Sequence, residues 1–263
     1  MDLGLAGLKA LICGSSTGLG FAAAQGLARE GCQVALNGRN KERLEIAAGQ
    51  LAGETSLPVI LSEGDLSKPE IPERVVQKAA AELGGLDILI TNAGGPPAGE
   101  FEDFDDQDWQ QAVELSFLSH MRLIRAALPY LRKSPHPSVL TVTSYSVKQP
   151  IPRLILSNSI RAATVGLTKS LALELGPEQI RFNSILPAYT ETQRVKNLLE
   201  HSANAAETSL EEEKDRISSQ SALGRMGKPE EFANAAVFLV SPAASYLTGV
   251  MLTVDGGMYK GVI

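Results

Sequence analysis

The segment Gly14-Ser15-Ser16-Thr17-Gly18-Leu19-Gly20 is the most informative motif in the amino-terminal part of this chain. It follows an apolar run, Leu8–Cys13, that predicts a buried strand, and it opens a helix predicted over Leu19–Glu30. The first glycine permits a tight turn, and the other two let backbone and helix approach closely. Exposed N–H groups at the start of such a helix face a phosphate. The segment therefore predicts a dinucleotide-binding loop, with a strand–helix turn that holds no ligand as the alternative.

Short apolar runs alternate with helix-like stretches along the rest of the chain. The further predicted strands are Cys32–Leu36, Val59–Leu61, Leu86–Ile90, Ser138–Val142, Ile180–Leu186 and Val250–Val254. The further predicted helices are Lys41–Leu51, Ile71–Leu83, Asp108–Leu131, Asn158–Leu175 and Pro229–Val240. Strands joined by such helices form a mostly parallel sheet that is covered on both faces. We expect an α/β, Rossmann-type doubly wound parallel sheet in a single domain, 1–263, with a nucleotide-binding half over about 1–140 and a catalytic or substrate half over about 141–263.

One stretch, Gln193–Gln220, interrupts this alternation. It has amphipathic helical character and carries the mixed-charge sequence EEEKDR. We predict a helical insertion near 193–220, either a solvated insert or a mobile lid over the site, because insertions in α/β enzymes often serve as lids.

The composition is that of an ordinary globular protein and argues against several classes of function. The 263 residues are 44% hydrophobic, and the formal net charge of −6 argues against a nucleic-acid-binding face. Cys13 and Cys32 lie in apolar runs and the three histidines are scattered, so no metal site is expected. The N-terminus lacks the pattern of a signal peptide, and no run reaches the roughly 18 apolar residues of a membrane span. We therefore expect a cytoplasmic protein that binds no membrane.

Further motifs follow the glycine-rich loop in an order that is typical of one family. They are Asp65-Leu66, Asn92-Ala93-Gly94, Ile180-Arg181-Phe182-Asn183 before Pro187, Gly224-Arg225, and Asp255-Gly256-Gly257. With the spacing G-x-x-x-G-x-G, the chain resembles the short-chain dehydrogenase/reductase family over almost its whole length. The resemblance implies that the cofactor is contacted by the loop, by Arg161, and by Ser16, Thr17, Leu19, Asp65, Leu66, Asn92, Ala93, Gly94, Pro187, Tyr189 and Thr192.

The end of the second strand distinguishes between the two nicotinamide cofactors. An NAD enzyme usually carries an acidic residue there, which holds the ribose 2′-hydroxyl. In this chain the position is Gly38, and Arg39 follows. A guanidinium can contact a 2′-phosphate bidentately, so we expect NADP(H), with a solvent-facing arginine as the alternative. Thr17 stands where some members of the resembled family carry a second basic residue, so Arg39 is expected to act alone.

The catalytic motifs of the resembled family are only partly present. The family uses an Asn, a Ser that orients the carbonyl, a Tyr that transfers the proton, and a Lys four residues later. Ser144 matches the Ser, but Ser157 stands at the Tyr position, Arg161 at the Lys position and Ser116 at the Asn position. Arg161 keeps the positive charge and can hydrogen-bond the ribose, but it cannot exchange protons at neutral pH. Loss of a positioned general acid typically costs about 10²–10⁴-fold in rate.

Three other side chains are candidates for supplying the missing proton. Tyr145 follows Ser144 directly, Lys148 lies in the same loop, and Tyr189 follows the Pro187-Ala188 turn. Each has a simpler interpretation, which is packing for Tyr145, a solvated charge for Lys148 and a position beside the cofactor for Tyr189. We retain Tyr145 with Ser144, Ser157 and Arg161 as the candidate catalytic residues.

The chain resembles a divergent branch of the family that is similar to β-ketoacyl carrier-protein reductases but lacks the Tyr and Lys. The resemblance implies an NADP(H)-dependent oxidoreductase of the 3-oxoacyl-[acyl-carrier-protein] reductase type, acting on a small carbonyl or alcohol substrate. The alternative is a non-catalytic NADP(H)-binding protein, a sensor or scaffold on the same fold. By analogy with the family, the two long helices are expected to pair copies into a homodimer or homotetramer.

Overall fold

Seven parallel strands form one sheet in the computed structural model, which describes residues 2–262. The order across the sheet is β3-β2-β1-β4-β5-β6-β7. The strands are β1 (Lys9–Ile12), β2 (Gln33–Gly38), β3 (Ile60–Glu63), β4 (Ile88–Thr91), β5 (Ser138–Val142), β6 (Arg181–Pro187) and β7 (Met251–Val254). This arrangement confirms the predicted Rossmann-type doubly wound sheet.

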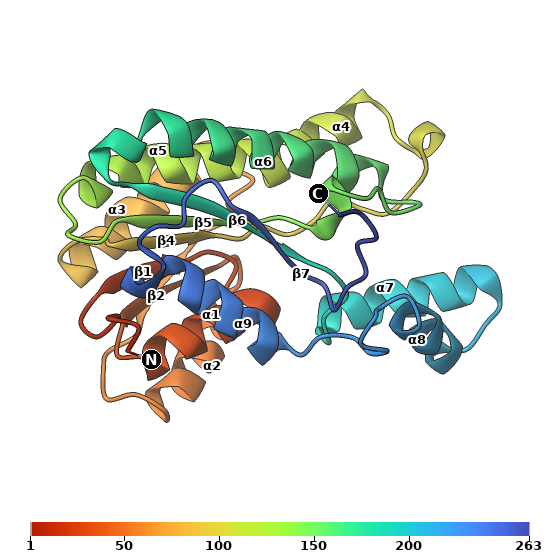
Figure 1. The fold of residues 1–263 in the computed structure, drawn as a ribbon, viewed down its shortest axis with the longest axis horizontal. Coiled ribbons are helices and arrows are strands. Elements are labelled where there is room, and N and C mark those ends of the chain that lie inside the picture. The colour runs from red at the N-terminus through yellow and green to blue at the C-terminus, as the bar shows by residue number, and fades with distance from the viewer. Residues whose placement is uncertain (1, 263) are drawn as a thin grey trace.

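Helices cover both faces of the sheet, as Figure 1 shows. One face carries α1 (Gly18–Arg29), α2 (Lys41–Ala52) and α9 (Pro229–Val240). The other carries α3 (Ile71–Leu83), α5 (Ser119–Leu131) and α6 (Ile155–Glu174). None of the helices within residues 2–262 is both long and apolar enough to cross a bilayer.

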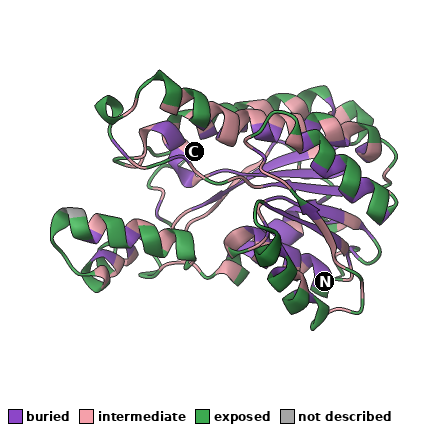
Figure 2. Ribbon diagram, turned by 180° about the vertical axis from the view of Figure 1, so that it is seen from behind, coloured by how far each residue is buried: buried purple, intermediate pink, exposed green. Residues whose placement is uncertain are grey.

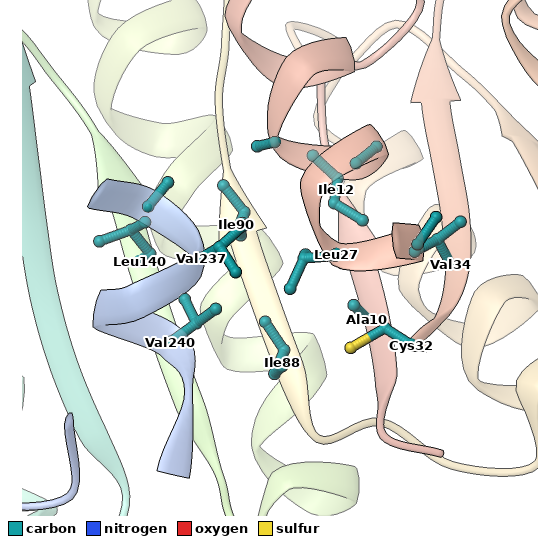
Figure 3. Packing of buried hydrophobic residues seen from close by; sticks show 14 of the residues in the cluster. Ala10, Ile12, Leu27, Cys32, Val34, Ile88, Ile90, Leu140, Val237 and Val240 are labelled. Atoms are coloured by element: carbon teal, nitrogen blue, oxygen red, sulfur yellow. The ribbon is translucent and has the colours of Figure 1, made fainter. Parts of the chain in front are cut away.

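A hydrophobic core lies on each face of the sheet. Successive side chains of a strand point to opposite faces, so they contribute to the two cores in alternation. In β4, Ile88 and Ile90 pack in the core under α1 and α9, whereas Leu89 packs in the core under α3 and α5. Leu27 of α1 and Val237 of α9 lie over Ile88 and Ile90 in the first core (Figure 3). Burial on both faces explains why the strands are continuous apolar runs, and Figure 2 shows them buried beneath helices whose outer sides are exposed.

The predicted helix Asp108–Leu131 is divided in the structure. It begins earlier, as α4 (Asp106–Val113), because the Asp105 side chain accepts a hydrogen bond from Asp108 N at 3.0 Å and caps its first turn. A π-helical stretch, Glu114–Leu118, then separates α4 from α5. Within it the carbonyl of Ser116 accepts a 2.7 Å hydrogen bond from the Thr164 hydroxyl of α6. The wider turn thus directs a backbone oxygen towards the neighbouring helix.

The insertion consists of two helices, α7 (Gln193–Ala206) and α8 (Leu210–Ser218), in agreement with its predicted helical character. Most of its residues are exposed, and it projects from the body of the molecule beyond β7 (Figures 1 and 2). Leu199 and Ile217 are buried and pack in a small cluster with Tyr145, Leu186 and Met258. The insert is therefore anchored beside the loop that follows β5.

Candidate active site

The site begins at the two central strands of the sheet, where the chain connections diverge. β1 and β4 are neighbours, but β2 and β3 follow on one side of them and β5 to β7 on the other. In open parallel sheets ligands bind at the carboxyl ends of such strands. Here Gly14 follows β1 and Asn92 follows β4, and Asn92 Nδ2 donates a 3.2 Å hydrogen bond to Gly14 O. The sequence-predicted loop and the Asn92-Ala93-Gly94 motif therefore meet at this edge.

The glycine-rich loop leaves the start of α1 open. Gly14 and Gly18 have φ angles of 55° and 62°, which only glycine adopts readily. A β-carbon at Gly20 would stand 2.9 Å from the carbonyl carbon of Gly14, so that position has no room for a side chain. The α1 N-cap residue Thr17 makes no side-chain cap, so the first-turn N–H groups remain available to an anion. These features fit the phosphates of a dinucleotide.

The second strand supports the loop and presents a cation beside it. Asn37 Oδ1 accepts a long, 3.4 Å hydrogen bond from Gly14 N, and its Nδ2 donates to Ser62 O at 2.9 Å. A β-carbon at Gly38 would stand 3.2 Å from Ser16 Cβ, so Gly38 lets strand and loop approach. Arg39 is exposed, and no carboxylate among residues 2–262 pairs with it. This arrangement fits a phosphate near Arg39 better than a hydroxyl.

The other expected contact residues lie along the same edge of the sheet. Leu66 is buried, and the Asp65 carboxylate accepts hydrogen bonds from Ser67 N and Oγ at 3.1 and 2.9 Å. Pro187 is the last residue of β6. Tyr189 follows two residues later, and burial raises the pKa of its phenol. Thr192 Oγ1 accepts from Val195 N at 3.3 Å and thereby caps α7. Its methyl group would stand 3.6 Å from a β-carbon at Gly18, so the start of α7 adjoins the glycine loop.

Ser144 follows β5 and carries a hydroxyl that is free to donate. Its Oγ accepts a 3.1 Å hydrogen bond from Ser146 N, which fixes the side chain and leaves the hydroxyl hydrogen available. The residue is half-buried. It is thus placed as a hydrogen-bond donor at the carboxyl edge of the sheet.

Ser157 and Arg161 are one turn apart on α6 and are hydrogen-bonded to each other. Arg161 Nε donates to Ser157 Oγ at 3.2 Å, and Arg161 Nη1 donates to the carbonyls of Val142 and Thr143 at 3.3 and 3.2 Å. Because these carbonyls immediately precede Ser144, the structure brings Ser144, Ser157 and Arg161 together. Burial, together with the positive charge of Arg194, lowers the pKa of Arg161 to about 10, so it stays protonated at neutral pH.

A buried polar group whose pKa is affected by Arg161 was not anticipated from the sequence. His120 Nδ1 lies 2.7 Å from Thr91 Oγ1, while His120 Nε2 and Ser116 Oγ have no hydrogen-bond partner among the described residues. Burial, with a smaller contribution from Arg161, lowers the pKa of His120 to about 3, so the ring is neutral. The i, i+4 spacing of Ser116 and His120 is the one sequence signal that could have linked them.

The other candidate proton donors are placed less favourably. Tyr145 is buried, with its ring centroid 6.5 Å from that of Tyr189. Burial, and then the charges of Tyr189 and Asp255, raise the pKa of Tyr145 to about 12. Lys148 Nζ lies over the Tyr259 ring, 5.2 Å from its centroid. A raised phenol pKa is opposite to what acid–base catalysis at neutral pH needs.

Arg194, in the first turn of α7, also reaches this edge and was missed in the sequence. A β-carbon at Gly95 would overlap its guanidinium and would stand 3.3 Å from Arg161 Nη2. Two features of the sequence lie at this contact. They are Gly95, a second glycine after Asn92-Ala93-Gly94, and Arg194, which is two residues after Thr192. Neither signal alone indicates that the two residues meet.

Comparison with known proteins agrees with this architecture. Residues 14–259 match the family described as enoyl-(acyl carrier protein) reductase. The chain is 34% identical to dehydrogenase/reductase SDR family member 4 of Bos taurus, over 94% of this chain and 86% of that protein. L-sorbose reductase from Gluconobacter frateurii, solved with NADPH and L-sorbose, is 32% identical with a TM-score of 0.95, and both chains are covered completely.

A second solved structure is similar to this chain and bears on its altered motifs. It is an NADPH-bound short chain oxidoreductase from Pseudomonas aeruginosa PAO1, described as containing an atypical catalytic center. It is 29% identical with a TM-score of 0.88, over 97% of this chain and 98% of that chain. An unusual catalytic centre and a bound NADPH therefore occur together in a protein of this fold.

Proposed function

The chain belongs to the short-chain dehydrogenase/reductase family, and we propose that it is an NADP(H)-dependent oxidoreductase that interconverts a carbonyl and an alcohol. The observation that carries the proposal is the open edge at Gly14 and Asn92, with Ser144 and Arg161 beside it. We assign the nucleotide to about 1–140 and the substrate to about 141–263.

The residues at this edge fit NADP(H) in both charge and shape. The uncapped start of α1 would hold the diphosphate, and the unpaired Arg39 would hold the 2′-phosphate. Nη2 of Arg161, which has no protein acceptor among the described residues, would donate to the nicotinamide ribose. When bound, the cofactor supplies a hydride and with it two electrons.

Two serine hydroxyls would act on the substrate. Ser144 and Ser157 each accept one hydrogen bond, from Ser146 N and from Arg161 Nε, so each can still donate its own hydrogen. Donation to a carbonyl oxygen orients the substrate and stabilises the negative charge that develops there. Neither hydroxyl ionises near neutral pH, so the proton gained by that oxygen comes ultimately from solvent.

We assign the finer reaction type to the 3-oxoacyl-[acyl-carrier-protein] reductase-like branch, with an atypical catalytic site. The support is the sequence resemblance to that branch and the match to a family described by acyl carrier protein chemistry. The atypical feature is the pair Ser157 and Arg161 in place of Tyr and Lys.

The test follows the absorbance of NADPH with a panel of ketones, oxo esters and quinones. Substrate-dependent loss of NADPH absorbance supports the proposal, and Ser144→Ala is expected to reduce it about 10²-fold. Absence of turnover with every compound, in a preparation that binds NADPH, contradicts it.

A second candidate function is NADP(H) binding without catalysis. It is favoured by one observation, namely that Arg161 donates to three protein acceptors beside a serine that cannot serve as an acid at neutral pH. An inert wild-type protein that binds NADPH tightly would support this function, and measurable wild-type turnover would exclude it.

We also propose that copies of the chain assemble through α5 and α6 into a homodimer or homotetramer. Leu173 on α6 is 72% exposed in the single chain, which leaves an apolar side chain uncovered. Light scattering after size-exclusion chromatography measures the mass, and Leu173→Glu is expected to shift it towards the monomer. A monomeric wild-type protein contradicts the proposal.

A further inference from the structure

Two arginines from distant parts of the chain converge on one glycine. Arg161 comes from α6 and Arg194 from the first turn of α7, and both reach Gly95 just beyond β4. A β-carbon at Gly95 would stand 2.9 Å from Arg194 Cζ and 3.3 Å from Arg161 Nη2. The sum of these distances places the two atoms no more than about 6.2 Å apart. In their present positions, only a residue without a side chain leaves room for both groups.

The two positive charges have no carboxylate partner. Over residues 2–262, no Asp or Glu forms an ion pair with Arg161 or Arg194, whereas Arg122, Arg216 and Arg225 each pair with a glutamate. The protein bonds of Arg161 go to a hydroxyl and two backbone carbonyls, and that of Arg194 to Gly95 O at 3.5 Å. Uncompensated like charges at this separation repel each other.

Burial and the helix dipole increase the attraction of this place for an anion. Arg161 is only 7% exposed, and a buried charge is unfavourable unless a counter-charge meets it. Arg194 is the second residue of α7, and the positive end of a helix dipole lies there. Burial and the nearby charge of Arg194 also lower the pKa of Arg161. An anion between the two guanidinium groups would offset both the burial of the Arg161 charge and the repulsion between the two charges.

We propose that Arg161 and Arg194 form a carboxylate-binding site and that the substrate is a small oxo acid, or the corresponding hydroxy acid in the reverse direction. The inference rests on the proposed function, because it assigns the anion to the molecule whose carbonyl meets Ser144. A carboxylate can accept from Arg194 and from one of the two N–H bonds of Arg161 Nη2, and the second N–H bond of Nη2 remains for the nicotinamide ribose. In the reduction, the carbonyl carbon gains the hydride, its oxygen gains a proton from solvent, and the carboxylate is unchanged.

The location of the pair favours a short substrate. Arg161 Nη1 is bonded to the carbonyls of Val142 and Thr143, directly before Ser144, and Nε is bonded to Ser157. The anion site and the two hydroxyls that would meet a carbonyl therefore share one side chain. An acid whose carboxylate lies close to its carbonyl can reach both, whereas a carbonyl at the end of a long neutral chain gains nothing from Arg194.

A phosphate of the cofactor is the other source of an anion at this edge. The diphosphate is expected at the start of α1, and Thr192, two residues before Arg194, adjoins Gly18. Arg161, however, is bonded to the end of β5 and to Ser157. A site that needs both arginines is thus better placed for the substrate, and the experiment below separates the two sources.

The experiment uses matched pairs, a 2-oxo or 3-oxo acid with its amide, presented to wild type and to Arg194→Met, Arg194→Lys and Gly95→Ala. Arg74→Met, on the exposed face of α3, is the control for loss of one positive charge. Calorimetry measures the Kd of NADPH, and then the Kd of each acid and amide with the NADP(H)-bound protein. NADPH oxidation gives kcat/KM for each compound, and thermal unfolding confirms that each variant folds.

Wild type is expected to prefer an acid over its amide by about tenfold to a hundredfold, the range for a charge-assisted hydrogen bond. Arg194→Met and Gly95→Ala should abolish this preference and leave the Kd of NADPH within about threefold of the wild-type value. Arg194→Lys should retain part of the preference for acids, and Arg74→Met should retain all of it. Equal binding of acids and amides by wild type overturns the inference. A weakened Kd of NADPH in Arg194→Met with an unchanged acid preference also overturns it and assigns the pair to the cofactor.

The binding measurements keep this inference separate from the proposed function. If no compound is reduced but acids still bind through Arg194, the carboxylate site stands and the reductase activity fails. If neutral ketones are reduced and acids are not preferred, the activity stands and the carboxylate site fails.

Discussion

Arg161 donates a 3.2 Å hydrogen bond through Nε to the hydroxyl of Ser157, one turn before it on α6. The sequence resemblance predicts that the pair stands where the family carries Lys and Tyr, and we propose that this local hydrogen bond takes the place of a proton donor and the cation that lowers its pKa. The double variant Ser157→Tyr/Arg161→Lys should therefore raise kcat for NADPH-dependent reduction by about 10²–10⁴-fold, because it restores a tunable phenol. Steady-state kinetics measures the change, with Ser157→Phe/Arg161→Lys as the control that lacks the phenol hydroxyl. An equal gain in both double variants would show that the hydroxyl is not responsible.

Arg39 is expected to set the cofactor preference. Arg39→Ala should raise the Kd of NADPH by about tenfold to a hundredfold and leave that of NADH nearly unchanged, because only NADPH carries the 2′-phosphate. Arg43→Ala, also exposed and four residues later, is the matched control and should alter neither value. Fluorescence titration with both cofactors measures the effect. A parallel loss of NADH and NADPH binding in Arg39→Ala would refute the assignment.

Gly20 tests whether the glycine loop is shaped by close contact. Gly20→Ala would force a β-carbon against the carbonyl of Gly14, and we expect a loss of about 1–3 kcal/mol in the free energy of unfolding together with weaker NADPH binding. Gly49→Ala is the control, because that position on α2 is exposed and has open space around it. It should gain roughly 0.5–1 kcal/mol from helix propensity. Urea unfolding of both variants measures the contrast, and a stable Gly20→Ala protein contradicts the close contact.

His120 predicts a pH dependence of stability with a definite sign. Its pKa is about 3 in the folded protein and near 6.5 when exposed, so between these values the unfolded chain binds a proton that the folded chain does not. The contribution of His120 to stability is therefore complete above pH 6.5 and decreases by about 1.4 kcal/mol per pH unit below it. His120→Gln removes the titration, so the stability difference between wild type and variant should change with this slope in urea unfolding. A difference that is constant from pH 4 to 7 excludes a neutral buried ring.

Tyr145 is expected to act in packing. Its side chain lies in the cluster with Leu186 and Leu199, and its raised pKa makes it a poor acid at neutral pH. Tyr145→Phe should keep kcat within about threefold of wild type, whereas Tyr145→Ala should lose about 3–5 kcal/mol of stability. If Tyr145→Phe abolishes turnover while NADPH still binds, Tyr145 is the proton donor.

The sequence was most informative where local chemistry marks an element's ends. The bounds of α3 and α9 match the prediction, because Gly84 ends α3 in a left-handed conformation and Pro229 begins α9. The helix α6 starts at Ile155, three residues before the predicted start at Asn158. The Asn158 side chain bonds to Ile151 O from within the first turn.

Features that depend on distant contacts could not be read in the sequence. The π-helical stretch Glu114–Leu118 lies in a run whose apolar spacing continues through it. The Thr164 hydroxyl, which donates to its Ser116 carbonyl, is 48 residues away. The motifs did place Ser144, Ser157 and Arg161 at one edge of the sheet. Arg194 was missed because its partner Gly95 is 99 residues away and no local pattern joins them.

The absence of a side chain at Gly95 makes the present position of the Arg194 guanidinium depend on residue 95. A β-carbon there would displace the guanidinium, so the arrangement of the two arginines requires glycine at 95. Glycine at 95 together with arginine at 161 and 194 forms a three-residue signature by which chains with this paired cation can be sorted from relatives that share only the fold.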